Sequence, residues 1–293
     1  MNIKREGLGE FNMILLSGYG DEISPDLDTQ LDVLEQEGIR YLDLRSVGSN
    51  VFPPVSNMLA LPEKEIVRMK KKIRERGFKV NSLNTSIGKY DIREPFTPQL
   101  HDLMHAICLA RFFETTNVRI FSFYVPKGAD PREYRDEVIC RMRLMAQIAE
   151  REGITLMLEN DALLYGSNGE RLRDIFHSVH SPCLRLAFDP ANFIQSQVLP
   201  MTDAYSYVWP YISWVQAKDA FINTGKAALI GEGDGQIREL LQRLQGKKYA
   251  GVISVESKLE STNQLEGFTR AQLFIMNVRL LKKLLREEGL SWT

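Results

Sequence analysis

Four largely apolar runs, at 154–158, 184–188, 211–215 and 251–255, each end on a residue that offers a side-chain oxygen. Those residues are Glu159, Asp189, Gln216 and Glu256. Three carboxylates brought together repel one another and are costly to desolvate, and a divalent cation removes that cost. Four oxygen ligands without nitrogen or sulfur suit Mn²⁺ or Mg²⁺ better than Zn²⁺. The open alternative is that each acid pairs singly with a Lys or Arg at the rim.

Alternation along these runs predicts that the acids share one interior. In an extended strand Glu159 lies on the face of Met157, whereas Leu156 and Leu158 lie on the other face. Asp189 and Glu256 likewise lie opposite the more apolar faces of their runs. Because the more apolar face packs against covering helices, the carboxylates point inward. The run that ends at Gln216 is less clear.

The runs belong to a repeated pattern of strand and helix. Gly38, Gly77 and Gly153 each close a helical stretch and precede an apolar one, as left-handed helix stops do. Ser24 is the expected N-cap of the first helix, with Pro25 at its first position. Expected strands centre on 13–17, 41–45, 79–84, 118–124, 154–159, 184–189, 211–217 and 251–256. Expected helices lie near 27–37, 62–76, 98–115, 131–152, 169–179, 203–209, 235–246 and 264–287.

This alternation predicts an α/β fold, a single (β/α)8 TIM barrel over 1–293, with 1–12 as an N-terminal extension. An open doubly wound sheet is the alternative, but the loop after the first strand lacks the G-x-G-x-x-G pattern of dinucleotide-binding proteins. Barrel sites lie at the carboxyl ends of the strands. The long loops 46–60 and 161–169 are expected to close over a substrate.

Further polar residues fall at or just past the expected strand ends. The candidates for substrate hydroxyl binding are Glu22, Arg45, Lys89, Tyr124, Asn192 and Lys218. All four histidines fall on or beside expected helices instead, so they are interpreted as surface residues of the outer ring. The glycine-rich segment 231–235 follows the seventh strand, where barrels often bind phosphate. Glu232 and Asp234 within it would repel an anion, which favours a neutral polyol or keto-sugar.

The composition of the chain indicates which classes of partner and which cell compartment to expect. The chain has 37 Lys and Arg against 38 Asp and Glu, and this balance argues against a nucleic-acid partner. The only N-terminal apolar patch, 13–16, is far too short for a membrane span, so no membrane association is expected. Three widely spaced cysteines without C-x-x-C spacing indicate reduced thiols in a cytoplasmic protein.

Taken together, the strand ends resemble those of the xylose isomerase-like barrel superfamily, in its sugar phosphate isomerase/epimerase branch with the ketose 3-epimerases and inosose dehydratases. The residues that carry the resemblance are 21–24 (DEIS), 41–45 (YLDLR), 119–124 (RIFSFY), 188–193 (FDPANF), 217–219 (AKD) and 253–256 (ISVE). The resemblance covers nearly the whole chain. It implies one divalent metal ion on Glu159, Asp189, Gln216 and Glu256.

Two departures from the family pattern bear on the reaction. Gln216 stands where the family usually has His, although the related 3-dehydroshikimate dehydratases also have Gln at this position. Asn192 stands where a second His is usual. Asp161, two residues past the first Glu, also replaces a frequent His.

The expected function is that of a metal-dependent sugar isomerase or epimerase. Glu159 and Glu256 would remove and return a proton next to the carbonyl of a keto-sugar or cyclic polyol, through an enediolate that the metal stabilises. The alternatives are a metal-dependent dehydratase and a barrel that binds carbohydrate without catalysis. The resemblance alone suggests a homodimer.

Overall fold

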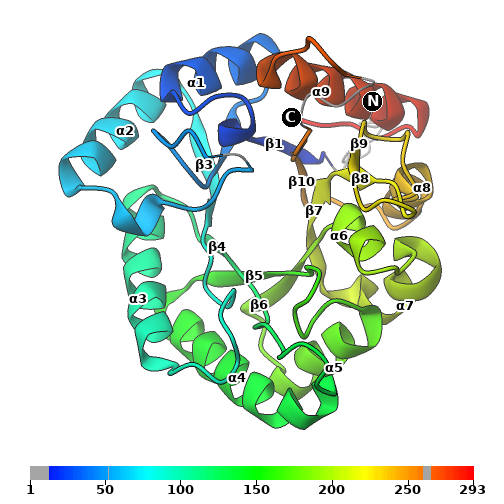
Figure 1. The fold of residues 1–293 in the computed structure, drawn as a ribbon. Helices are drawn as coiled ribbons and strands as arrows, with labels where there is room; N and C mark the ends of the chain where they lie inside the picture. Colours follow the sequence, from blue (N-terminus) through cyan, green and yellow to red (C-terminus); the bar gives the residue numbers. More distant parts are fainter. Residues whose placement is uncertain (1–12, 52, 260–264) are drawn as a thin grey trace, which may run out of the picture.

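Eight parallel strands close into a barrel in the computed structural model, which describes residues 13–51, 53–259 and 265–293 (Figure 1). The order around the barrel is β1-β10-β7-β6-β5-β4-β3-β2. The strands are β1 (Leu15–Tyr19), β2 (Tyr41–Leu44), β3 (Lys79–Asn84), β4 (Asn117–Ile120), β5 (Thr155–Glu159), β6 (Leu184–Phe188), β7 (Ile212–Ala217) and β10 (Val252–Val255). The predicted (β/α)8 barrel is confirmed, whereas the extension expected at 1–12 lies outside the described residues.

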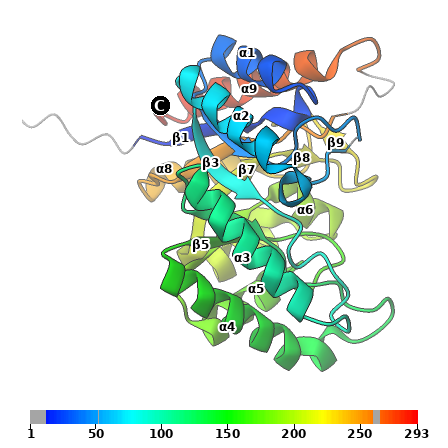
Figure 2. The ribbon, with the colours of Figure 1, turned by 90° about the vertical axis from the view of Figure 1, so that its left-hand side faces the viewer.

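Helices surround the strands as an outer ring (Figures 1 and 2). They are α1 (Leu27–Gln36), α2 (Glu63–Glu75), α3 (Thr97–Phe112), α4 (Arg135–Glu152), α5 (Gly169–Val179), α6 (Pro190–Gln195), α7 (Tyr205–Val208), α8 (Ile237–Gly246) and α9 (Arg270–Glu287). Each long helix turns an apolar stripe toward the barrel; in α2 the stripe is Ile66, Met69 and Ile73, spaced three and four residues apart and buried. The core therefore lies between the ring and the strands.

Helix ends follow the sequence pattern with one correction. Gly38, Gly77 and Gly153 have φ of +66°, +71° and +64°, as left-handed helix stops require. The predictions of Ser24 as N-cap and Pro25 as the first helical residue are wrong. Helix α1 begins at Leu27, and the Asp26 carboxylate accepts the Thr29 N–H at 2.9 Å. A carboxylate in this place also faces the positive end of the helix dipole.

Several boundaries differ from the expected ones. The strand expected over 118–124 ends at Ile120, because Phe123 has φ +69° and its N–H donates to the Gly88 carbonyl of the neighbouring loop at 2.8 Å. The helix expected near 203–209 is a π-helical turn over Pro200–Ala204 followed by α7. Thr269 caps α9, so that helix begins at Arg270 rather than near 264, which lies outside the described residues.

Two elements close to the strand ends have no counterpart in the expected pattern. Helix α6 follows β6 directly, with Asp189 as its N-cap. A small antiparallel hairpin, β8 (Asp219–Ala220) and β9 (Ala227–Ala228), follows β7. Both elements are too short for hydrophobic periodicity to reveal.

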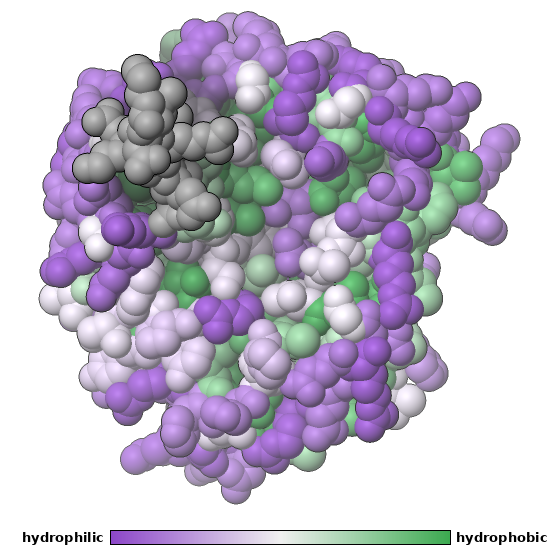
Figure 3. Space-filling view, turned by 180° about the vertical axis from the view of Figure 1, so that it is seen from behind, coloured by the Kyte–Doolittle hydropathy of each residue, from purple (hydrophilic) through white to green (hydrophobic). Residues whose placement is uncertain are grey.

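The two ends of the described chain lie side by side. Ile14 forms a parallel bridge with Trp292, and the Thr293 N–H donates to the Ile14 carbonyl at 2.9 Å. Figure 3 shows the opposite side from Figure 1, with hydrophilic side chains around the rim and hydrophobic ones nearer the middle. Among the described residues, no helix combines the length and apolar character needed to cross a membrane.

Candidate metal and catalytic site

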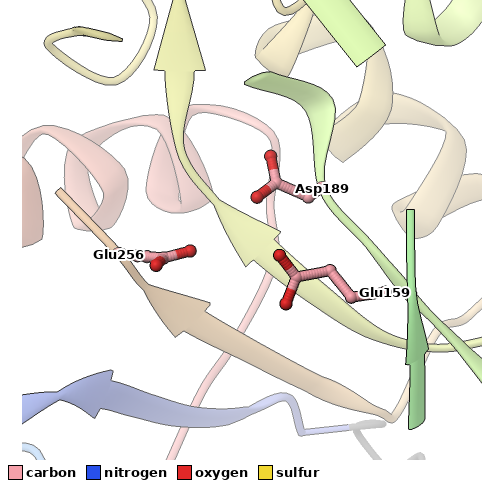
Figure 4. A group of neighbouring side chains, drawn as sticks. All are labelled: Glu159, Asp189 and Glu256. Atoms are coloured by element: carbon pink, nitrogen blue, oxygen red, sulfur yellow. The ribbon is translucent and has the colours of Figure 1, made fainter. Parts of the chain in front are cut away.

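Three buried carboxylates meet at the carboxyl end of the barrel, as the alternation of the strands predicts (Figure 4). Glu159 ends β5, Asp189 follows β6 and Glu256 follows β10. One oxygen from each lies within 4.8 Å of the others, and each of the three residues is at most 1% exposed. Within the described part of the chain this is the group whose spacing and chemistry could hold a metal ion.

Each carboxylate also has a cationic partner. Arg119 lies 3.1 Å from Glu159 Oε2, and Lys218 donates to Asp189 Oδ2 at 2.8 Å. Arg45 donates to Glu256 Oε1 at 2.5 Å. The alternative that the acids pair with basic side chains is thus part of the structure, although the partners are buried and not at the rim. The acids are therefore paired with basic side chains and also form a cluster that could hold a cation.

Arg45 is shared among several acids, so its charge does not neutralise Glu256 alone. It also pairs with Asp21, at 2.8 Å, and with Glu22. Glu22 in turn accepts the backbone N–H of Lys258 at 3.0 Å. Lys258 Nζ also lies 3.4 Å from Glu256 Oε1, so Glu256 shares its basic neighbours with the other buried acids.

Asn192, at the start of α6, connects these groups. Its Nδ2 donates to Glu159 Oε1 at 2.9 Å, and its Oδ1 accepts from Lys218 Nζ at 2.7 Å. Its backbone N–H donates to Asp189 Oδ1 at 2.9 Å. The side chain is 2% exposed and fully engaged. Its present contacts therefore orient the two acids and Lys218.

Gln216 occupies the floor of the site. Its Nε2 donates to Glu159 Oε2 at 3.0 Å and to the Tyr19 hydroxyl at 2.8 Å. Its Oε1 is buried and has no hydrogen-bond partner among the described residues, and the same holds for Glu256 Oε2. Buried polar atoms without a partner are rare because they cost about 1–3 kcal/mol each. Two unsatisfied oxygens beside an acidic cluster are what a cation would bind, so the residues present fit a divalent metal.

The surroundings give the acids different proton affinities. Burial raises the pKa of Asp189 to about 7, although Lys218 opposes the rise. Burial acts on Glu256 in the same direction, but Lys218, Lys258 and Arg45 bring its pKa well below the ordinary value. Glu256 is therefore held ionised at neutral pH. Burial lowers the pKa of Lys218, but Asp189 and Glu256 outweigh it and keep the ammonium charged.

The other predicted residues fall into two groups. Glu22, Arg45 and Lys218 are buried within 4 Å of the site acids or their partners. Lys89 and Tyr124 are half-buried at the mouth, where Lys89 pairs with Asp161 at 2.5 Å. The four histidines are all exposed on the ring, as expected.

Sequence reasoning missed two residues of the site, Arg119 and Tyr19. Arg119 lies opposite Met157 in the register of β4 and β5, on the face that Glu159 shares. The signal in the sequence is that Arg119 is the one charged residue of β4, between Val118 and Ile120. The Tyr19 ring stacks on Trp214 with centroids 6.2 Å apart, and the Arg45 guanidinium lies 4.6 Å above it. Nothing in the pattern distinguished Tyr19 from a core residue.

A closed parallel barrel with acids at its strand ends defines the class, and comparison with known proteins supplies the family. Residues 31–284 match the family described as xylose isomerase-like TIM barrel, and the chain belongs to that family. A search of curated proteins finds no match.

Solved structures share the fold at low sequence identity. IOLI protein with a bound zinc atom is 13% identical over 94% of this chain and 99% of its own, with a TM-score of 0.75. A D-tagatose 3-epimerase-like protein is 17% identical over 94% and 98%, with a TM-score of 0.74. The probable 3-DHS dehydratase AsbF from Bacillus anthracis is 12% identical over 92% and 98%, with a TM-score of 0.71.

Proposed function

We propose that this protein is a divalent-metal-dependent isomerase or epimerase of a keto-sugar or related polyol. The observation that carries the proposal is the buried cluster of Glu159, Asp189 and Glu256, with unsatisfied oxygens on Glu256 and Gln216. These four residues would hold the ion, with Mn²⁺ or Mg²⁺ favoured by the all-oxygen donor set. When bound, the ion would polarise a substrate carbonyl and so acidify the neighbouring C–H.

The other steps of the proposed reaction, proton transfer and substrate binding, are assigned to side chains of the site. Glu159 and Glu256 come from β5 and β10, on different sides of the mouth, so one would take a proton from carbon and the other would return it. Arg119 pairs with Glu159 and Arg45 pairs with Glu256, so these two arginines orient the acids. Lys218, with its ammonium charged, would donate a hydrogen bond to a substrate oxygen.

A metal-dependent dehydratase is the second candidate, and Gln216 favours it. AsbF, described as a probable 3-DHS dehydratase, shares the fold. The same proton abstraction followed by loss of a β-hydroxyl would give that reaction. Both candidates begin with the same step, so one experiment tests them together.

The first experiment measures binding of Mn²⁺, Mg²⁺ and Zn²⁺ by calorimetry, with elemental analysis of the purified protein. We expect one ion per chain in wild type and at least tenfold weaker binding, about 1.4 kcal/mol, in Glu159→Gln and Glu256→Gln. Glu232→Gln, on the glycine-rich loop, is the control and should bind as wild type does. Absence of binding in wild type would contradict the metal proposal and favour the non-catalytic barrel.

The second experiment follows exchange of substrate C–H for deuterium in D₂O, with keto-sugars and inososes as probes. This exchange reports proton abstraction whichever product forms. We expect exchange in wild type and a loss of about 10²-fold or more in Glu159→Gln. Release of water from the substrate would select the dehydratase.

A further inference from the structure

The glycine-rich segment 231–235 surrounds a carboxylate of its own chain. Gly231 and Gly233 donate their N–H groups to Asp219 Oδ2 at 2.9 and 3.1 Å. Gly235 and Ala220 donate theirs to Asp219 Oδ1 at 2.8 and 2.9 Å. Several backbone N–H groups that converge on one point form an anion-binding nest. Here the anion is the side chain of Asp219.

The nest fits this carboxylate closely. Asp219 is 1% exposed. A Cβ on Gly233 would lie 2.4 Å from Asp219 Oδ1, and one on Gly235 would lie 2.6 Å from the same atom. The glycines are therefore required by the carboxylate that lies among them. With four N–H groups directed at its two oxygens, the nest has no room for a second anion.

The nest lies where a barrel of this kind would hold a phosphate. Phosphate sites of TIM barrels use the loops after the seventh and eighth strands and the start of a nearby helix. Asp219 directly follows Lys218 of the site, and a Cβ on Gly235 would lie 3.4 Å from Pro190, next to Asp189. Helix α8 begins two residues after Gly235 with Glu239 in its first turn, where a carboxylate opposes anion binding.

We propose that Asp219 permanently fills this nest, and that the substrate of the barrel therefore carries no phosphate group at the end that faces segment 231–235. The inference rests on the proposed function, since it names the class of substrate for that site: an unphosphorylated keto-sugar or polyol. Asp219 takes the place that a substrate phosphate would need.

Thermal unfolding in inorganic phosphate, against chloride at equal ionic strength, tests the nest without any need for turnover. Asp219→Ala removes the internal anion and opens the nest. We expect a lower Tm than wild type and a recovery of about 3 °C in phosphate. Wild type and the control Asp234→Asn should show no such phosphate effect. An equal effect in wild type would overturn the inference.

Two further measurements keep the inference testable if Asp219→Ala does not fold. The backbone N–H signals of Gly231, Gly233 and Gly235 in wild type should not move when inorganic phosphate is added, and movement would overturn the inference. For any sugar that wild type exchanges with deuterium, its terminal phosphate ester should react at least tenfold more slowly in kcat/KM. A faster phosphate ester would also overturn it. Failure of every sugar to exchange would contradict the proposed function alone, because the phosphate measurements do not depend on turnover.

Discussion

Lys218 places an ammonium group between two of the three buried carboxylates. Its Nζ lies 2.8 Å from Asp189 Oδ2 and 3.7 Å from Glu256 Oε2. An isolated buried charge is strongly destabilising, whereas a paired one is tolerated. At the scale of single residues, Lys218 lets the buried acids lie close together, and it would compete with a divalent ion bound to the same oxygens.

Replacement of Lys218 by Met separates these two effects. Without metal, we expect the free energy of unfolding to fall by about 3 kcal/mol, because Asp189 loses its buried partner. Calorimetry should show Mn²⁺ binding about tenfold tighter, about 1.4 kcal/mol, because a competing positive charge is gone. Lys89→Met is the matched control, since Lys89 pairs with Asp161 at the half-buried mouth. Unchanged Mn²⁺ affinity in Lys218→Met would show that Lys218 does not compete with the ion.

Among the elements, the start of α4 is fastened to α5 by an ion pair. Arg135, the first residue of α4, holds Asp174 through two N–H donors, each at 2.7 Å. The hydrogen bonds from Arg135 lower the pKa of Asp174 below 3.8. A carboxyl group whose pKa is lower in the folded state than in the unfolded state stabilises the folded protein at pH values above the unfolded-state pKa. This stabilisation is lost as the pH falls through the folded-state pKa.

We therefore expect Asp174→Asn to cost about 1 kcal/mol of unfolding free energy near pH 7, since the pair is partly exposed. The difference from wild type should shrink as pH falls below 3.8. Urea denaturation at several pH values measures it. Asp136→Asn is the control, because Asp136 meets the same arginine at 3.0 Å but is 95% exposed. A difference that stays constant with pH would contradict the linkage.

For the whole molecule, the chain end helps to complete the barrel wall. Trp292 bridges to Ile14 beside β1 and packs, half-buried, against the main core. Strand β1 pairs with β2 on one side and β10 on the other, so it closes the barrel between the first and last strands. The contact between Ile14 and Trp292 therefore joins the two ends of the described chain beside β1, where the barrel closes.

Trp292→Ala should lower the free energy of unfolding by about 1–3 kcal/mol, through loss of the apolar area that the indole buries. Chemical denaturation measures the change. Arg286→Ala is the control: its guanidinium lies 5.9 Å from the indole centroid on an exposed position, and we expect about 0.5 kcal/mol or less. Equal stability of wild type and Trp292→Ala would show that the chain end does not support the closure.

The sequence by itself determined the barrel and the inward direction of its acids. Both depend on short-range periodicity, since helix stops such as Gly153 and the alternation around Glu159 are written in neighbouring residues. The sequence does not locate the start of α1, because Ser24 and Asp26 are both good N-cap residues and only the path of the chain selects Asp26.

Only the tertiary structure decided which groups the acids meet. Arg119, Lys218 and Asn192 come from separate elements, and nothing local in the sequence assigns each of them to its acid. The contact between Asp219 and Gly235 is another example, because the two residues lie far apart in the sequence. The sequence alone therefore does not show whether the glycine-rich loop binds Asp219 or a phosphate. Periodicity fixes the face on which a side chain lies, but contacts across the barrel depend on register and closure, which are set by the packing of the whole chain.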